Sequence, residues 1–365
     1  MKVRNLLVSA SLAILGACGG GGADESFKVV VSFGDSLSDV GSYRTPGVGS
    51  LGGGQYTVNG AAIGATPAIN WTELLAAVLE LAPPCAARTG LQSSGPLAAL
   101  AAPVIDHADC TGYAQGGARV ADPVGPWNSA LLALGSPSGY LGQLTEPVSA
   151  QVANHLQRSR GRFDARELVT VWAGANDLFM QLFQLQAAIA GGADATQAAQ
   201  SAVQAMATAG AALAATIHDE IVGRGARRVL VLTVPDVGLT PFAASQPAQM
   251  RALMTSMAAA FNAPLTTALT GNPKTLLVDM FVASQEQHAA PADWGLSNTT
   301  SPACDLTRMV IPSSLVCSSP GTLVAGDTKL YLYADDVHPT PYGHLLIALL
   351  AYAAMVDAHW ADPPN

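Results

Sequence analysis

The sequence predicts an α/β fold, with layers of helices around a mostly parallel β-sheet. Two observations predict it. Short apolar runs alternate along the chain with longer segments of helical periodicity, and the runs lie at residues 27–33, 168–172, 228–234 and 275–281. No repeat of 20–50 residues is present, and no linker divides the chain after its first residues, so we expect one domain over residues 27–362.

The four apolar runs are predicted to be buried strands. Residues 27–33 contain three consecutive valines and stop at Gly34. The second run is followed by the segment 174–177, and the third by a turn at Pro235 and Asp236. No Gly or Pro closely follows the run at 275–281, so the sequence does not define where that strand ends.

Helices are predicted where apolar residues recur with a period near 3.6, at residues 71–81, 148–158, 194–222, 247–269 and 342–360. Asp194 suits an N-cap, and Pro247 suits a first helical turn. Pro264 is expected to kink its helix or end it early. Segments 44–70 and 85–145 are rich in turn-forming residues, so we expect loops there.

The composition excludes some classes of protein. Half of the 365 residues are hydrophobic, 12% are charged, and the formal net charge is −9. The mean hydropathy is +0.30, but the apolar excess is spread along the chain rather than gathered in a span. Because there is no long basic run to neutralise phosphates, nucleic-acid binding is not expected.

Residues 1–18 have the features of an export signal. Lys2 and Arg4 precede a short apolar stretch at residues 6–15, which is too short to span a bilayer. The segment ending at Cys18 resembles the lipobox of bacterial lipoproteins, and the Gly-rich residues 19–26 look like a tether. We therefore expect lipidation of Cys18, attachment to the membrane and an outer-membrane or cell-envelope location. The alternative is a secreted protein with an ordinary cleaved signal and an incidental cysteine.

Four cysteines remain beyond Cys18, namely Cys85, Cys110, Cys304 and Cys317. An even number in an exported chain favours disulfides, and three connectivities exist. We favour the local pairs Cys85–Cys110 and Cys304–Cys317, because each closes a short, loop-like segment. A metal site is the rival, but no CxxC motif or histidine cluster accompanies the cysteines.

Ser36 follows the first predicted strand directly, in a turn opened by Gly34. Such a turn projects a side chain above the edge of a sheet, but a serine needs a base to become a nucleophile. His338 suits the base, because Asp335 three residues before it can turn back and hold its Nδ1–H. Asp336 is nearer to the histidine and suits that role less well.

Three donors are candidates for stabilising an oxyanion. Asn176 follows the second predicted strand and can donate from its side-chain amide. At Gly116 and Gly117 no Cβ intervenes, so a backbone N–H can come close to a ligand. The N–H of Ser36 itself is the third candidate.

Each of these residues also has a structural interpretation. Ser36 would be a helix N-cap, His338 a surface histidine, and Asn176 a turn residue after a strand. For Asp39 and Asp177 we favour the structural role, in which each carboxylate holds nearby backbone. The combination of all these residue types in one chain favours the catalytic interpretation of the first three.

Four segments of the chain are similar, in sequence and order, to the signature blocks of the SGNH, or GDSL, hydrolase family. The segments are Phe33-Gly34-Asp35-Ser36-Leu37-Ser38-Asp39, Tyr113-Ala114-Gln115-Gly116-Gly117-Ala118, Gly174-Ala175-Asn176-Asp177 and Asp335-Asp336-Val337-His338. The resemblance spans residues 28–350. One position departs from the pattern, since the second block usually opens with Asn and here has Gly112.

The resemblance implies a three-layer α/β/α sandwich of the flavodoxin-like type. It implies Ser36 as nucleophile and, with it, Asp335 and His338 as the rest of the triad. The implied oxyanion hole consists of Ser36, Gly117 and Asn176, and neither a cofactor nor a metal is required.

We therefore expect a serine carboxylic ester hydrolase that works through an acyl-enzyme. The favoured activity is that of a lipase-like esterase, a monomer acting on a small-molecule or lipid ester. Within the same chemistry, a lysophospholipase, an acyltransferase or a carbohydrate deacetylase is the runner-up. A surface-binding lipoprotein without catalysis is the hypothesis from a different class.

Overall fold

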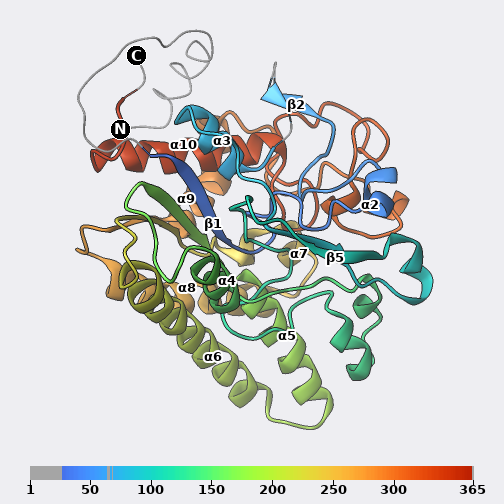
Figure 1. The fold of residues 1–365 in the computed structure, drawn as a ribbon. Coiled ribbons are helices and arrows are strands. Elements are labelled where there is room, and N and C mark those ends of the chain that lie inside the picture. The colour runs from blue at the N-terminus through green and yellow to red at the C-terminus, as the bar shows by residue number, and fades with distance from the viewer. Residues whose placement is uncertain (1–26, 64–65, 68, 364–365) are drawn as a thin grey trace.

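A computed structural model describes residues 27–63, 66–67 and 69–363 (Figure 1). The predicted signal segment, Cys18 and the tether at 19–26 lie outside the described residues. A parallel four-stranded sheet forms the centre, in the order β1 (Val29–Gly34), β6 (Glu167–Trp172), β7 (Arg228–Leu232) and β8 (Thr275–Val278). The mostly parallel sheet predicted from the sequence is confirmed.

A short segment around Gly112 lies along the free side of β1. Ser32 N donates to Thr111 O (3.0 Å), and Tyr113 N donates to Ser32 O (2.8 Å). If this segment is counted as the second strand, the order across the sheet is 2-1-3-4-5, the doubly wound order of flavodoxin. In such sheets ligands bind at the carboxyl ends of the strands, where the order reverses between β1 and β6.

Helices cover both faces of the sheet, so the fold has three layers (Figure 1). Successive side chains of β1 point to opposite faces, with Val31 on one face and Val30 on the other. The Val31 face packs against helices α4 (Val148–Arg158), α5 (Ala175–Ala190), α6 (Ala195–Ala215) and α8 (Ala248–Leu269). The Val30 face packs against α3 (Trp71–Val78), α9 (Met280–Ala289) and α10 (Pro341–Asp357).

Most predicted helices are present, with some shifted ends. The bounds of α4 agree with the prediction, and Asp194 caps α6 by accepting from Gln197 N (2.8 Å). The chain continues from α6 into a π-helical segment, η5 (Thr216–Val222), as the long periodic pattern predicts. Helix α5, which begins immediately after Gly174, was not predicted from the sequence.

In the second half of the chain, one helix and one strand end elsewhere than the sequence suggested. Pro264 does not end α8 early, since the helix runs on to Leu269. The flanking Phe261 and Leu265 are fully buried, so tertiary packing outweighs the hydrogen bond that a proline removes. The fourth strand stops at Val278 rather than at residue 281, because Asp279 caps the new helix α9 through Val282 N.

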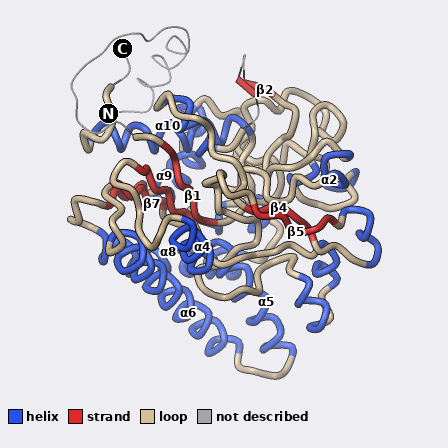
Figure 2. Tube along the Cα trace, in the orientation of Figure 1, coloured by secondary structure: helices blue, strands red, loops and turns tan. Residues whose placement is uncertain are grey.

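The Gly- and Pro-rich segments 44–70 and 85–145 contain more helices and strands than expected. Loops are still the main structure in this part of the molecule (Figure 2). Residues 85–145 contain an antiparallel hairpin, whereas only loops were expected. The short elements are α2 (Pro46–Ser50), β2 (Ala62–Ile63), β3 (Thr66–Pro67), β4 (Arg88–Leu91), η2 (Gly95–Leu100), β5 (Ala102–Asp106), η3 (Ser129–Leu134), η4 (Pro137–Leu141), η6 (Val237–Leu239), α7 (Pro241–Ala244), η7 (Pro291–Trp294), η8 (Leu306–Arg308) and η9 (Ser314–Val316).

Two disulfides close local segments of these loops. Cys85 is bonded to Cys110 across the base of the β4–β5 hairpin, and Cys304 is bonded to Cys317. These are the two local pairs that the sequence analysis favoured. Within the described ranges, none of the helices combines the length and apolar character needed to cross a bilayer.

Candidate active site

Three side chains from the two ends of the chain form a continuous line of hydrogen bonds. Ser36 Oγ lies 2.8 Å from His338 Nε2, although 302 residues separate the two positions. On the other side of the ring, His338 Nδ1 lies 2.8 Å from Asp335 Oδ2 and 2.9 Å from Oδ1. The structure thus brings together a hydroxyl, a base and an orienting carboxylate, which is the arrangement that activates a serine.

Ser36 is positioned by the close approach of β1 to β6. Gly34 ends β1 with φ +152°, and a Cβ at this position would come within 2.1 Å of Trp172 O. Gln151 on α4 binds both sides of the Gly34 peptide, because Gly34 N donates to its Oε1 and its Nε2 donates to Gly34 O, each at 2.8 Å. Ser36 is therefore held at the carboxyl edge of the sheet, with 7% of its surface exposed.

Asp335 is buried, and both of its carboxylate oxygens accept hydrogen bonds. Its Oδ1 accepts from the backbone N–H groups of Val337 (3.0 Å) and His338 (2.8 Å), and its Oδ2 accepts from Ser314 N (2.6 Å). Burial by itself raises the pKa of Asp335, but His338 and these N–H groups outweigh burial and hold the pKa below its ordinary value. Asp335 thus stays ionised beside the ring, while no hydrogen bond joins the half-buried Asp336 to the histidine in the described structure.

The three candidate oxyanion donors lie at the carboxyl ends of the strands or in the block after Gly112. Asn176 sits in the first turn of α5, and its Nδ2 donates to Ala118 O at 2.9 Å, which leaves its second N–H available. Gly117 has φ +79°, a conformation that favours glycine. Within the described part of the chain, the backbone N–H groups of Ser36 and Gly117 have no acceptor.

Two further carboxylates hold this backbone in place. Asp39 accepts from Gly41 N and Ser42 N in its own loop and from Gly116 N (2.8 Å) in the second block. Asp177 accepts from Val120 N (3.0 Å) and from the Arg119 side chain. Burial raises the pKa of both carboxyls, and the hydrogen bonds oppose that shift. Both residues therefore have the structural role that the sequence analysis favoured.

The departure from the family pattern at Gly112 has a steric cause. A Cβ at this position would lie 2.6 Å from Val40 Cγ2 and 2.9 Å from Cys85 O. The segment is wedged between β1 and the backbone at Ala86, with which it forms a further bridge. The space that a side chain would need is occupied by neighbouring atoms.

Tyr56 packs on His338, a contact that the sequence did not indicate. Its ring centroid lies 4.7 Å from that of His338, with 33° between the planes. Its hydroxyl accepts from Gln143 Nε2 at 2.6 Å, and the lack of a side chain at Gly116 leaves room for it. The contact of Gln151 with Gly34 was not predicted either. A polar residue on the apolar side of the 148–158 helix could have indicated that Gln151 is buried and hydrogen-bonded.

Comparisons with known proteins show which family the chain matches. Residues 30–351 match the family described as GDSL-like Lipase/Acylhydrolase. A Pseudomonas putida protein, named "Uncharacterized protein in trpE-trpG intergenic region", is 29% identical over 362 residues. The match covers 96% of this chain and 52% of that protein, so the chain spans about half the length of this curated relative.

Among solved structures, the chain is similar to LAE5, described as an alpha/beta hydrolase enzyme from the metagenome of Lake Arreo, Spain. The identity is 14%, the TM-score is 0.38, and the match covers 92% of this chain and 97% of that one. No group of three or more His, Cys, Asp or Glu residues within the described ranges could hold a metal ion.

Asp35, next to the candidate nucleophile, is a buried carboxyl with incomplete hydrogen bonding. Its Oδ1 accepts from Leu37 N (3.0 Å), but its buried Oδ2 has no partner in the described structure. Burial raises the pKa of Asp35 to about 7, against the opposing effects of the Leu37 N–H and of His338. Near neutral pH this carboxyl is therefore partly protonated.

The variant Asp35→Asn tests that protonation. A folded-state pKa above the unfolded value means that the native chain holds a proton that the unfolded chain releases, so Asp35 destabilises the fold as pH rises from about 4 to 7. Asparagine does not titrate. We expect the stability of the variant relative to the wild type to rise by about 1.4 kcal/mol per pH unit between about pH 4.5 and 6.5.

Urea unfolding at three pH values in this interval measures the slope. Asp109→Asn, which makes the same change at an exposed position, is the control. A stability difference between Asp35→Asn and the wild type that is constant with pH would contradict the raised pKa.

Proposed function

This chain belongs to the GDSL-like lipase/acylhydrolase family, and from that premise we propose that it hydrolyses carboxylic esters with Ser36 as nucleophile. The observation that carries the proposal is the line of hydrogen bonds from Ser36 through His338 to Asp335. Family membership supports ester hydrolysis in general. The assignment of each residue to a step rests on the geometry and on the chemistry of the side chains.

In the first half of the reaction, His338 Nε2 takes the proton of Ser36 as Oγ attacks the ester carbonyl. The carbonyl π-electrons move to oxygen, which gives a tetrahedral oxyanion. As the carbonyl re-forms, the bond to the alcohol oxygen breaks, and His338 returns its proton to the departing alcohol. Asp335 remains ionised throughout and stabilises the imidazolium.

In the second half, water attacks the acyl-enzyme and gives its proton to His338. The bond between the acyl carbon and Ser36 Oγ breaks, the acid leaves, and the proton returns to Ser36. Both tetrahedral intermediates would be stabilised by the N–H groups of Ser36 and Gly117 and by the Asn176 amide. These donors are already held in place before the reaction, so little reorganisation is needed as charge develops.

An aromatic pair beside the triad supports an apolar acyl group as substrate. Phe179 lies on α5 one turn after Asn176, and Phe242 N donates to Asp336 O (3.0 Å) next to the triad loop. The two half-buried rings meet edge to face, with centroids 5.3 Å apart. This apolar surface favours a lipase-like esterase over the runner-up deacetylation of carbohydrates, while a lysophospholipase or acyltransferase would use the same surface.

We further propose that the chain is exported and acts as a monomer with one domain at residues 27–362. The two disulfides are consistent with export, because such bonds form and persist in oxidising compartments. Lipidation of Cys18 would then hold the domain at the cell envelope.

The nucleophile can be tested with a fluorophosphonate probe, which forms a covalent bond with activated serines. The wild-type chain is expected to be labelled and Ser36→Ala to lose all labelling and ester turnover, since Ser36 is the hydroxyl paired with His338 Nε2 in the described structure. Ser256→Ala changes an exposed serine and should keep both. Labelling that survives Ser36→Ala contradicts the nucleophile, and a wild type with neither labelling nor turnover favours a non-catalytic binding protein.

The oxyanion hole can be tested through Asn176→Ala. Loss of one donor to the developing charge should lower kcat about 10²- to 10³-fold while KM changes little. Steady-state kinetics on p-nitrophenyl butyrate measures both constants, and a thermal melt checks that loss of the bond to Ala118 O leaves the fold intact. A raised KM with unchanged kcat would instead place Asn176 in ground-state binding.

The aromatic pair predicts the preference for acyl chain length. In Phe242→Ala, kcat/KM for p-nitrophenyl octanoate should fall roughly tenfold more than for the acetate, because contact with the longer chain is lost. Ile189→Ala is the control, since this exposed residue lies about 15 Å further along α5 from Phe179. An equal loss on both esters would show that Phe242 does not contact the acyl chain.

A further inference from the structure

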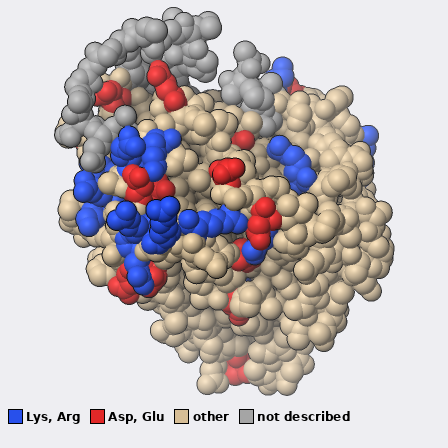
Figure 3. Space-filling model, in the orientation of Figure 1, with Lys and Arg blue, Asp and Glu red and all other residues tan. Residues whose placement is uncertain are grey.

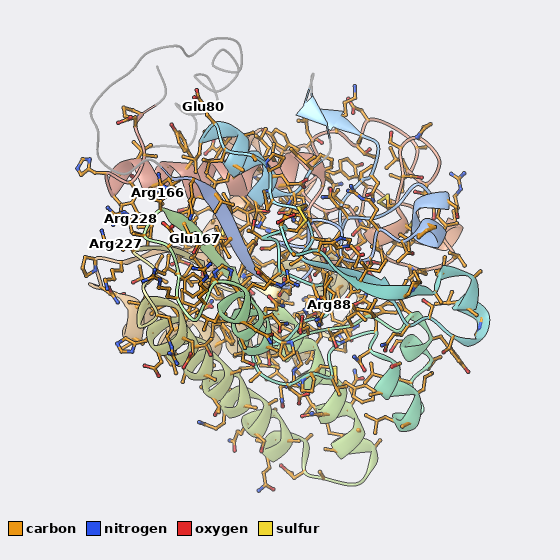
Figure 4. The ribbon with its side chains drawn as sticks, in the orientation of Figure 1. Glu80, Arg88, Arg166, Glu167, Arg227 and Arg228 are labelled. Carbon is orange, nitrogen blue, oxygen red and sulfur yellow. A yellow bond between two sulfur atoms is a disulfide. The ribbon has the colours of Figure 1, made fainter. Side chains whose placement is uncertain are left out.

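Basic side chains gather where the strands of the sheet begin (Figure 3). Parallel strands start at a common edge, and Lys28, Arg166, Arg228 and Lys274 stand at or directly before the starts of β1, β6, β7 and β8. Backbone hydrogen bonds join these segments, since Lys28 N donates to Arg166 O (3.0 Å) and Val229 N donates to Lys274 O (2.9 Å). Figure 4 shows Arg166, Arg227 and Arg228 together at this edge.

We call this surface the basic edge and define it by eight of the 17 Lys and Arg residues in the chain. The eight residues are Lys28, Arg160, Arg162, Arg166, Arg224, Arg227, Arg228 and Lys274. The segment before β6 is tied to the segment before β7, because Phe163 N donates to Arg224 O (2.9 Å). This gathering of basic residues contrasts with the formal net charge of the whole chain, which is −9.

Among the ion pairs between described residues, two join a carboxylate to a member of the basic edge. Lys28 pairs with Asp164, and Arg224 pairs with Glu220 at 3.3 Å. Arg228 lies over the Trp360 ring, 5.3 Å from its centroid. A further four members are exposed, and within the described ranges they form no ion pair: Arg160, Arg162, Arg166 and Lys274. These four side chains therefore present positive charge to solvent.

Helix dipoles do not account for this charge. Helix α4 ends at this edge, and a cation in its last turn, such as Arg158, is stabilised there. The dipole effect fades beyond the last turn, however, so Arg160 and Arg162 gain little from it. Lys28 and Arg166 precede strands rather than follow helices. The accumulated charge is thus more than the fold requires.

We propose that the basic edge docks on the surface of an anionic phospholipid bilayer. Lipid phosphates are the complement of a cluster of Lys and Arg, and each basic residue near such a surface strengthens binding about fivefold. The first described residue, Phe27, is adjacent to Lys28, so the described part of the chain begins at this edge. Nine residue steps from Phe27 back to Cys18 reach at most about 32 Å, which keeps a lipidated Cys18 close to the same membrane.

The orientation has a consequence for the substrate, and this part rests on the proposed function. Ser36 lies eight residues after Lys28, at the other end of β1, which is about 26 Å along an extended chain. With the basic edge on the bilayer, the triad faces the aqueous phase. The structure thus assigns to the site esters that arrive from solution, rather than lipids of the bilayer on which the domain rests.

Vesicle sedimentation of the full chain carrying Cys18→Ser tests the docking without a lipid anchor. We expect binding to vesicles containing phosphatidylglycerol, none to phosphatidylcholine alone, and release at high salt. The triple variant Arg160→Glu, Arg162→Glu and Arg166→Glu should bind at least about 100-fold more weakly, from three fivefold losses.

The control triple variant makes the same change in net charge outside the basic edge, at the exposed residues Arg251→Glu, Arg308→Glu and Lys329→Glu. It should lose less than about threefold, since these charges lie away from the surface. Equal loss in both triple variants, or no wild-type binding to anionic vesicles, would overturn the docking surface.

Turnover measured in the same samples separates the two proposals. A wild-type chain that binds vesicles but does not hydrolyse p-nitrophenyl acetate refutes the proposed function and leaves the docking surface standing. Rapid hydrolysis of the phosphatidylglycerol in the vesicles, at the rate of the soluble ester, would overturn the proposed orientation of the active site.

Discussion

The close approach of β1 to β6 is the constraint on which the site depends. At Gly34 the backbone lies so near Trp172 O that a Cβ would come within 2.1 Å. Because the two strands end together, Ser36 after β1 and Asn176 after β6 emerge at the same edge, where the strand order reverses. Gly174 has φ +122° and fits against the Phe261 ring, so a second glycine completes the same junction. Any side chain at Gly34 would force β1 and β6 apart at the point after which Ser36 and Asn176 follow.

Buried carboxylates hold the loops around the site, which are not part of the central sheet. Asp39, Asp177 and Asp335 each accept backbone N–H groups from a segment other than their own, at Gly116, Val120 and Ser314 respectively. Such bonds between a charged acceptor and the backbone are stronger than neutral ones. The long segments between β1 and β6, and between β8 and α10, are thereby held around Ser36 and His338.

The sequence was most informative where the signal is local. The line of hydrogen bonds from Ser36 through His338 to Asp335 could be anticipated, because Asp335 and His338 are three residues apart and Ser36 follows a valine-rich strand. Helix α4 was predicted with its bounds, since its apolar spacing is regular. Contacts between distant segments were not predictable: Tyr56 meets His338 across more than 280 residues, and Gln151 reaches Gly34 from another layer. Pro264 was misjudged because local propensity does not include the burial of its helix.

The disulfide between Cys304 and Cys317 encloses Ser314, whose backbone N–H donates to Asp335 Oδ2. The carboxylate that orients the proposed base is thus held partly by a segment that is covalently closed only after two thiols are oxidised. The covalent closure and the setting of Asp335 are adjacent in this arrangement, because the loop that the disulfide closes carries the N–H group that donates to Asp335 Oδ2. Under the proposed export, this loop would close only in an oxidising compartment, where such a bond forms and persists.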